Sequence, residues 1–288
     1  MPYLEELSVY DLVQYLNQQD LKPQLAVAGA VNQIAQAIEA MVPRMEQGGK
    51  VRVAGAGTSG RLAQLDASEL PPTFGIDQDQ WKTLMAGGRD AFWNAVEGAE
   101  DNVEAGFKDM ASETLGMNDI VIGVAASGRT PYVQGALQAA ERAGCLRIGI
   151  FCVSTPPLQP LTHITITVPV GPEPLSGSTR MLAGTAQKMV LNIISTGVMV
   201  RLGHTLHNLM IDMKPSNHKL KLRAEAIVQE LLDCDDNTAR SLLQQHQYQI
   251  RPALIQALTG SGDWDSFKGS MGPLWKLRHL DGIDIPAE

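Results

Sequence analysis

Three turns rich in serine and glycine lie where short apolar runs give way to helical patterns. Ser59-Gly60-Arg61 recurs as Ser127-Gly128-Arg129-Thr130 and, in altered form, as Ser176-Gly177-Ser178-Thr179-Arg180. Each turn follows an expected strand and opens an expected helix, whose N-terminus offers free backbone N–H groups and a positive dipole end to an anion. A single turn of this kind is most simply a helix cap. Three of them at neighbouring strand ends predict a site for a phosphorylated sugar.

The first turn also completes the pattern Gly55-x-Gly57-x-x-Gly60, which follows a strand and opens a helix in dinucleotide-binding folds. Such a site needs an acidic residue about 20 residues later, at the end of the next strand, to hold a ribose. The next expected strand ends Leu84-Met85-Ala86-Gly87-Gly88 and carries no acid. The sequence therefore disfavours a nicotinamide site, and no cofactor is expected.

Two groups of carboxylates follow the first turn. Glu69 shares a helix face with Leu62 and Leu65, where an apolar residue is expected, and it lies at the carboxyl end of that helix. Partial burial and the negative dipole end both disfavour its charged form, so we expect a raised pKa, which suits a general acid. Glu97 and Glu100 lie at the end of the next expected helix, where acidic residues usually form a solvated face. Spacing alone selects neither of them.

Expected strands and helices alternate along the chain, which predicts an α/β fold with a doubly wound parallel sheet flanked by helices and ligands at the carboxyl ends of the strands. A helix from Arg61 is expected to stop at Pro71-Pro72, and another to start near Asp90 with Phe92, Trp93 and Val96 facing a core. The expected strands are 51–54, 83–86, 119–124, 146–152 and 163–170.

The remaining segments are expected to be helical. Residues 1–50 hold amphipathic patterns, with Ser8 as a candidate cap, and a long helix is expected at 181–202. Short amphipathic helices are expected at 224–232, 238–245 and 251–258. The predicted parts are N-terminal helices (1–48), a phosphosugar-binding domain (49–218) and a small helical C-terminal region (219–288).

Composition narrows the functional classes. The 288 residues carry a net charge of −8 and no cluster of Lys or Arg, which argues against nucleic acid as a partner. The three cysteines show no metal-binding spacing, and His204 and His207 have no convergent carboxylate, so no metal site is expected. The sequence shows no leader and no apolar run of about 18 residues, so we expect a cytoplasmic protein without a membrane partner.

Five longer segments resemble N-acetylmuramic acid 6-phosphate (MurNAc 6-phosphate) etherases, which belong to the sugar isomerase (SIS) domain superfamily. The resemblance covers roughly residues 20–230. The segments are AGTSGRLAQLDASELPPTFG (56–75), MAGGRDAFWNAVEGAED (85–101), GVAASGRTPYVQGAL (123–137), GSTRMLAGTAQKMVLNIIST (177–196) and NLMIDMKPSN (208–217).

This resemblance implies an SIS fold, a homodimer, and cleavage of the D-lactyl ether of MurNAc 6-phosphate to N-acetylglucosamine 6-phosphate (GlcNAc 6-phosphate) and D-lactate. In the family's pattern Glu69, in D-A-S-E, is the general acid and Glu100, in E-G-A-E, is the general base. We assign the phosphate and the sugar to the three turns. The predicted binding residues are Gly57, Thr58, Ser59, Gly60, Arg61, Ser127, Gly128, Arg129, Thr130, Ser178 and Thr179.

Three positions depart from the family's pattern, because Leu182 and His204 stand where lysines are usual and His207 stands where a glycine is usual. These differences bear on turnover and substrate choice rather than on the fold. Two other functions stay open. An aldose–ketose isomerase of the same superfamily also removes a C2 proton, and a non-catalytic phosphosugar sensor, like the glucokinase regulatory protein, needs no proton transfer. The presence of both Glu69 and Glu100 favours the lyase.

Overall fold

The computed structural model of the chain describes residues 3–259, which form two compact units. The first unit contains the residues up to Ala67 together with Gln78–Thr196. The second contains Ser68–Asp77 together with the residues from Gly197 onward. The part of the predicted C-terminal region after residue 259 lies outside the described residues.

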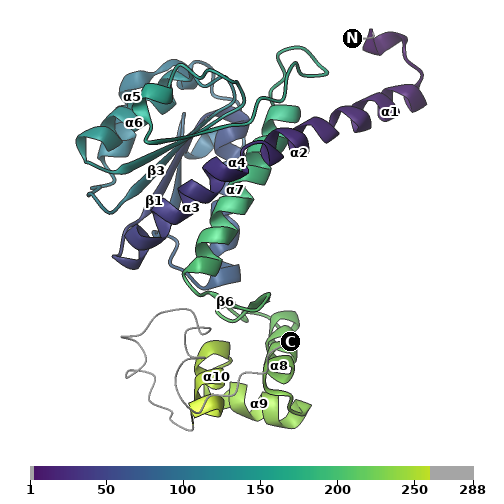
Figure 1. The fold of residues 1–288 in the computed structure, drawn as a ribbon, viewed down its shortest axis with the longest axis vertical. Helices are drawn as coiled ribbons and strands as arrows, with labels where there is room; N and C mark the ends of the chain where they lie inside the picture. Colours follow the sequence, from purple (N-terminus) through teal and green to yellow (C-terminus); the bar gives the residue numbers. More distant parts are fainter. Residues whose placement is uncertain (1–2, 260–288) are drawn as a thin grey trace. The chain divides into compact units, whose positions relative to one another are not determined.

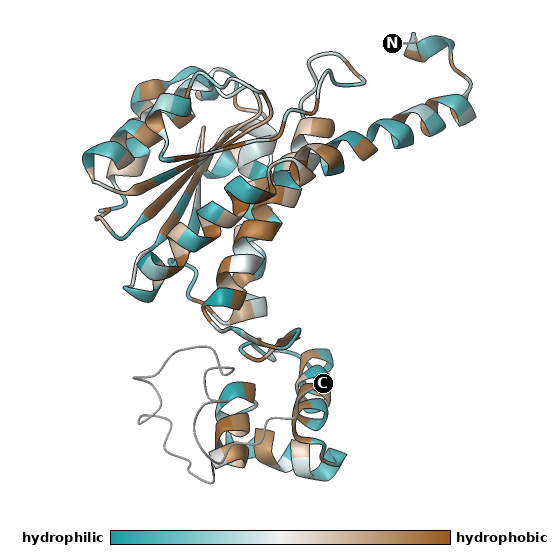
Figure 2. Cartoon of the chain, in the orientation of Figure 1, coloured by the Kyte–Doolittle hydropathy of each residue, from teal (hydrophilic) through white to brown (hydrophobic). Residues whose placement is uncertain are grey.

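A parallel sheet of five strands, in the order β2-β1-β3-β4-β5, forms the centre of the first unit. Its strands are largely hydrophobic (Figure 2), and every residue of β1 and β3 is buried, as expected for strands covered on both faces. The chain runs from β1 to β2 and then returns to β3 on the other side of β1. The order thus reverses between β1 and β3, where open α/β sheets bind ligands. The strands are β1 (Val51–Gly55), β2 (Trp81–Met85), β3 (Ile120–Ala125), β4 (Leu146–Phe151) and β5 (Ile164–Thr167).

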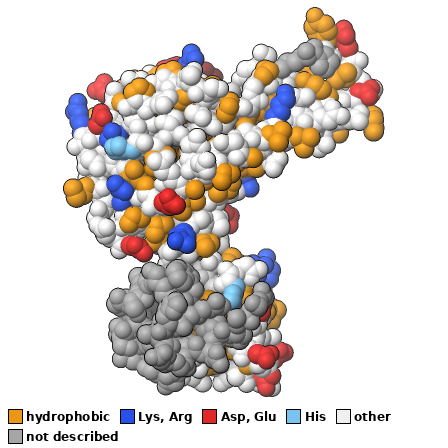
Figure 3. Space-filling model, viewed as in Figure 1, with side chains coloured by type: hydrophobic (Ala, Val, Ile, Leu, Met, Phe, Trp, Pro, Cys, Tyr) orange, Lys and Arg blue, Asp and Glu red, His pale blue; other side chains and the backbone are white. Residues whose placement is uncertain are grey.

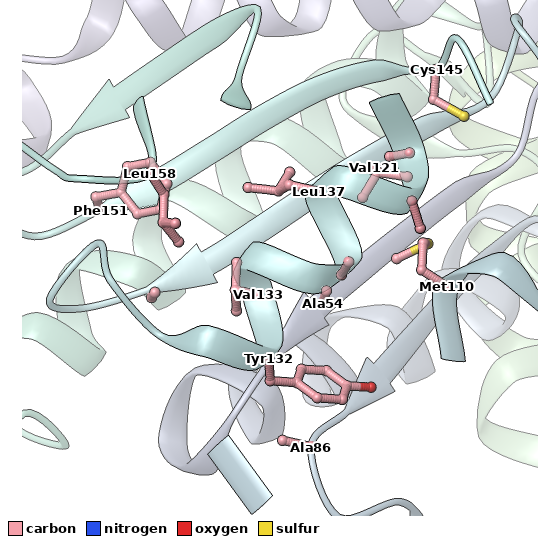
Figure 4. Packing of buried hydrophobic residues seen from close by; sticks show 14 residues of the cluster. Ala54, Ala86, Met110, Val121, Tyr132, Val133, Leu137, Cys145, Phe151 and Leu158 are labelled. Carbon is pink, nitrogen blue, oxygen red and sulfur yellow. The ribbon is translucent and has the colours of Figure 1, made fainter. Parts of the chain in front are cut away.

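Helices cover both faces of this sheet (Figure 1), which confirms the predicted fold class. One face is covered by α6, which packs against α5, while α3 packs on β4 and β5. Figure 4 shows Val133 and Leu137 of α6 packed with Ala54 and Val121 of the sheet. The helices are α3 (Val31–Glu46), α4 (Gly57–Phe74), α5 (Val103–Ala111), α6 (Pro131–Arg142) and α7 (Leu182–Arg201).

Two glycines let α5 and α6 cross in backbone contact. A Cβ atom added to Gly106 would lie 1.9 Å from the carbonyl oxygen of Tyr132, and one added to Gly135 would lie 1.9 Å from that of Val103. The Tyr132 hydroxyl also donates a hydrogen bond of 2.8 Å to Asp109. Because α5 directly follows the Glu97–Asp101 segment, this crossing fixes the downstream end of the segment that carries Glu100.

We expect Gly135→Ala to lower the free energy of unfolding by about 3 kcal/mol or more, because a methyl group cannot share the space of the Val103 carbonyl oxygen and the helices must separate. Urea unfolding followed by circular dichroism measures the change. Gly116→Ala is the matched control, since a Cβ at this exposed position meets nothing closer than Asp119 Oδ2 at 3.9 Å. Equal stability of the two variants would contradict the close crossing.

The expected stop at Pro71-Pro72 is wrong, because α4 continues through both prolines to Phe74. Leu70 and Phe74 are buried, and this packing offsets the missing proline N–H groups. Backbone hydrogen bonds also hold the last turn. Gly75 N–H donates to the Pro71 carbonyl at 3.0 Å, and Lys214 N–H donates to the Pro72 carbonyl at 3.2 Å.

The expected helix from Asp90 is also wrong. The segment forms only two short 3-10 turns, Arg89–Phe92 and Ala99–Asp101, and Trp93 is 87% exposed rather than part of a core. Gly98 has a φ of +71°, which interrupts a right-handed helix. The carbonyl groups that would accept helical hydrogen bonds near Phe92 instead face the side chain of Arg61.

The N-terminal helices begin where the sequence predicts, with the Ser8 hydroxyl accepting a hydrogen bond from Asp11 N–H. These helices are α1 (Val9–Gln19) and α2 (Leu21–Ala28), followed by α3. Within residues 3–259 no single helix has both the length and the apolar composition to cross a membrane, although the bent pair Val9–Ala28 and Val31–Glu46 passes that test together.

Three short helices and a small hairpin make up most of the second unit. The helices bury one shared core, which confirms the expected helices in the 224–258 region. Asp212 lies at the centre of a polar cluster: it accepts hydrogen bonds from His204 Nδ1 at 2.8 Å and from Arg251 Nε at 2.7 Å. The elements are α8 (His218–Leu232), α9 (Asp236–Gln245), α10 (Ile250–Thr259), β6 (Thr205–Leu206) and β7 (Leu209–Met210).

This cluster makes the second unit sensitive to acid. Burial raises the pKa of Asp212, but hydrogen bonds from His204 and Arg251 outweigh burial and hold that pKa below its ordinary value of 3.8. Its contribution to stability is therefore present above pH 3.8 and lost as the pH falls through the lower folded-state pKa. Urea unfolding at pH 7 and at pH 3 should show a smaller pH dependence in Asp212→Asn than in wild type. Asp236→Asn, at an exposed position, should keep the wild-type dependence; identical behaviour of the two variants would contradict this role of Asp212.

Candidate active site

A cavity of about 210 Å³ lies in the first unit, at the carboxyl ends of β1 and β2. It brings together three of the residues that the sequence predicts, namely Gly57, Arg61 and Glu100. Glu97 lines the same cavity. The full lining is Ala56, Gly57, Arg61, Met85, Ala86, Ala91, Asn94, Ala95, Val96, Glu97, Gly98, Ala99 and Glu100.

The glycines of the first turn have different physical roles. Gly55 and Gly60 pack β1 against α4, since a Cβ added to Gly55 would lie 2.8 Å from Gly60 N, and one added to Gly60 would lie 3.0 Å from Gly55 O. Gly57 has a φ of +53°, and a Cβ added there would meet no atom within 4 Å. Gly57 therefore exposes backbone to the cavity, where a ligand can approach closely.

The side chain of Arg61 crosses from α4 to the segment after β2. Its Nη2 donates to the Ala91 carbonyl at 2.8 Å and to the Asn94 carbonyl at 3.1 Å, while Nε donates to the Phe92 carbonyl at 3.2 Å. Arg61 thus lines the cavity and binds backbone of the segment that carries both glutamates.

Glu97 and Glu100 both have exposed side chains on the Gly87–Asp101 segment. Asn102 ends this segment and caps α5, since its side-chain oxygen accepts a hydrogen bond of 2.9 Å from Ala105 N–H. Two glutamates therefore line the cavity, and each is a candidate for a general base.

The second turn, at the end of β3, leaves a helix N-terminus without a side-chain cap. Thr130 precedes α6 and makes no capping hydrogen bond, so the first N–H groups of α6 are available to an anion. Gly128 has a φ of +64°, and a Cβ there would lie 2.4 Å from Pro156 Cβ, so a side chain is excluded. Ser127 and Thr130 are half-buried and Arg129 is exposed. Their role as ligands stays a prediction.

The third turn differs from the second, because the start of α7 is already occupied. The buried carboxylate of Glu173 accepts hydrogen bonds from Leu182 N–H at 2.8 Å and from Ala183 N–H at 2.9 Å. The expectation that all three helices present free N–H groups is therefore wrong for α7. Ser178 and Thr179 precede this start, and their assignment to the ligand stays a prediction.

Thr58 and Ser59 lie beside α7. Ser59 is 8% exposed, and its hydroxyl donates to Gln187 Oε1 at 2.9 Å. The Thr58 methyl group lies 3.3 Å from the Cβ position of Gly184. In this arrangement Ser59 joins two helices.

Glu69 is exposed on α4, and Leu65 on the same face is 53% exposed. The expected partial burial of Glu69 is therefore wrong for the single chain. The buried face of α4 is instead formed by Ala63, Ala67 and Leu70. Glu69 belongs to the Ser68–Asp77 segment of the second unit, and its role as the acid stays a prediction.

Asp66 is a buried acid that is not among the predicted site residues. Its Oδ1 accepts hydrogen bonds from Asn192 Nδ2 at 2.5 Å and from Ser195 Oγ at 3.0 Å, whereas Oδ2 has no hydrogen-bond partner among the described residues. Burial raises the pKa of Asp66 despite these hydrogen bonds. In the sequence, the position of Asp66 among the apolar residues of α4 is the feature that could have indicated a buried acid.

The two residues that stand in place of the family's lysines occupy defined places. Leu182 is fully buried at the start of α7, where an apolar side chain fits, and His204 binds Asp212 in the second unit. Among residues 3–259 no group of three or more His, Cys, Asp or Glu side chains is placed to hold a metal ion.

The fold is that of sugar isomerase (SIS) domain proteins. A phosphoheptose isomerase from Francisella tularensis is 20% identical, with a TM-score of 0.51 over 67% of this chain and 100% of that one. A candidate phosphosugar isomerase involved in capsule formation, from Bacteroides fragilis, is 20% identical, with a TM-score of 0.54 over 73% of this chain and 98% of that one. Residues 33–141 match the family described as the glucokinase regulatory protein N-terminal SIS domain.

Comparison with curated sequences identifies the family within the SIS-domain proteins. An N-acetylmuramic acid 6-phosphate etherase from Caldanaerobacter subterraneus is 45% identical over 92% of this chain and 86% of its own length. The etherase from Erwinia tasmaniensis is 48% identical over 89% of this chain and 84% of its own length. The chain belongs to the N-acetylmuramic acid 6-phosphate etherase family.

Proposed function

We propose that this chain is a carbon–oxygen lyase that cleaves the D-lactyl ether of MurNAc 6-phosphate and yields GlcNAc 6-phosphate and D-lactate. Family membership gives the substrate class. The observation that carries the proposal is the placement of Glu100 in a cavity at the carboxyl ends of β1 and β2, beside the open backbone of Gly57.

Two carboxyl groups account for the chemistry without a cofactor. In the ring-opened sugar, C2–H lies next to the C1 aldehyde and the lactyl ether oxygen is bonded to C3. Glu100 removes the C2 proton, the C3–O bond breaks, and Glu69 protonates the departing oxygen, which leaves as D-lactate. Water then adds to C3 of the unsaturated aldehyde, and the two groups exchange their roles.

The phosphate anchors the end of the sugar that does not react, and this remote binding energy orients C2 and C3. The uncapped start of α6, with Ser127 and Thr130, supports its assignment to the phosphate. The adjacent glycine, Gly128, keeps this turn free of a side chain that would collide with Pro156.

We propose a cytoplasmic homodimer. Helix α1 buries no residue, and its apolar residues Val9, Tyr10 and Val13 are 80%, 75% and 61% exposed. Figure 3 shows hydrophobic side chains along the N-terminal helices. An exposed apolar stripe of this kind is typical of an interface between subunits. Light scattering should give twice the chain mass of 31.1 kDa.

Incubation of the purified protein with MurNAc 6-phosphate, followed by an assay for D-lactate, tests the function. Release of D-lactate together with GlcNAc 6-phosphate supports the etherase. Interconversion of an aldose and a ketose phosphate without lactate would identify an isomerase instead. Binding of the sugar phosphate without any turnover would identify a sensor.

A further inference from the structure

The segment that carries Glu100 contains little regular structure, and its internal backbone hydrogen bonds are those of short turns. Its residues 93–98 are all exposed, and Ala95 and Val96 belong to no helix or strand. The two 3-10 turns that flank this stretch contain only three or four residues each. A stretch of exposed backbone with so little regular structure needs another group to fix its path.

Arg61 supplies that group. Its Nε and Nη2 reach three carbonyl oxygens, from Ala91, Phe92 and Asn94, within a run of four residues. A charged donor strengthens each hydrogen bond, and the convergence of three carbonyl dipoles on one position is unfavourable without a cation there. Arg61 itself is fixed, because it lies in the first turns of α4, which packs against β1 through Gly55 and Gly60.

The remaining boundaries of the segment are also fixed. Upstream it continues from β2, and downstream Asn102 caps α5, which Gly106 and Gly135 hold against α6. Between these boundaries the side chain of Arg61 joins the backbone of the segment to α4, and Arg61 and Glu100 line the same cavity.

We propose that Arg61 is a positioning residue, which holds the Gly87–Asp101 segment so that Glu100 faces the C2 proton of the substrate. This inference rests on the proposed function and replaces the expectation that Arg61 binds the substrate. Three of the five guanidinium N–H groups are used in the backbone contacts. A lysine ammonium is a single point of charge and cannot span the three carbonyl groups.

Arg61→Lys and Arg61→Gln separate positioning from phosphate binding. We expect both variants to lower kcat for lactate release, and the rate of solvent deuterium exchange at C2, by about 100-fold, the cost typical of a misplaced catalytic group. Affinity for GlcNAc 6-phosphate, measured by calorimetry, should change less than about threefold. Added guanidinium should restore part of kcat in Arg61→Ala. If Arg61→Lys keeps kcat while Arg61→Gln loses affinity, Arg61 binds phosphate and the proposal is overturned.

Hydrogen–deuterium exchange of the backbone tests, independently of turnover, whether Arg61 holds the segment. Arg61→Lys and Arg61→Gln should lose protection in residues 89–101 and keep it in α5 and α6. Arg44→Gln is the matched control, because it removes another arginine–carbonyl contact, from Arg44 Nη1 to the Ala40 carbonyl at 2.8 Å on α3. Unchanged protection of residues 89–101 would overturn the proposal even if the wild type is an etherase. A wild type that releases no lactate would instead defeat the proposed function, and the exchange experiment would still decide whether Arg61 holds the segment.

Discussion

Glu100→Gln is expected to lower lactate release by about 1,000-fold and to stop solvent deuterium exchange at C2, because the amide keeps the shape of the side chain and cannot accept the C2 proton. Lactate release is measured enzymatically, and exchange is measured by mass spectrometry of the sugar in deuterated water.

Glu97→Gln is the matched control for this variant. Glu97 lines the same cavity and is also exposed, so the substitution makes the same change of charge three residues away. We expect it to lower activity far less. If Glu97→Gln stops C2 exchange while Glu100→Gln retains it, the base is Glu97.

Glu69→Gln is expected to lower lactate release by a similar factor, about 1,000-fold, while leaving C2 exchange measurable. The reason is the order of the steps. The base removes the C2 proton before the ether bond breaks, so loss of the acid blocks departure of lactate without blocking exchange.

The comparison of the two glutamate variants is the decisive measurement for the acid. Mass spectrometry of MurNAc 6-phosphate recovered from deuterated water should show label at C2 after incubation with Glu69→Gln and none after incubation with Glu100→Gln. Normal lactate release by Glu69→Gln would remove this residue from the mechanism.

Much of the fold could be predicted from the sequence because its signals are local. Apolar runs place β1 and β3 within one residue of their observed bounds, and Ser8 marks the start of α1. Alternation of strands and helices then leaves few topologies, and a parallel sheet is the one observed.

The sequence-based predictions that are wrong fail because of tertiary interactions. Proline signals were outweighed at Pro71 and Pro72 by the burial of Phe74, and an amphipathic pattern after Asp90 did not form a helix where Arg61 binds the backbone. The buried face of α4 consists mainly of alanines, which give a weaker periodic signal than Leu62 and Leu65, so Glu69 was assigned to the wrong face.

The roles of the predicted site residues stay predictions, but local sequence and topology together bring three of these residues to one place. Gly57, Arg61 and Glu100 meet in one cavity because the carboxyl ends of parallel neighbours lie at one edge. Hydrogen bonds between distant segments were not predictable, since Gln187 meets Ser59 and Glu173 meets the start of α7 only after folding. The three-part division at residues 48 and 218 stays a prediction.

Glu173 has a consequence for the selection of ligands by charge. Its carboxylate gives α7 a resident anion of its own, in contact with the two amides that begin the helix. A phosphate brought to that position meets a like charge and an acceptor that already holds these amides, whereas one brought to α6 meets amides that no side chain caps. We therefore expect the start of α7 to disfavour a second phosphate group on the sugar.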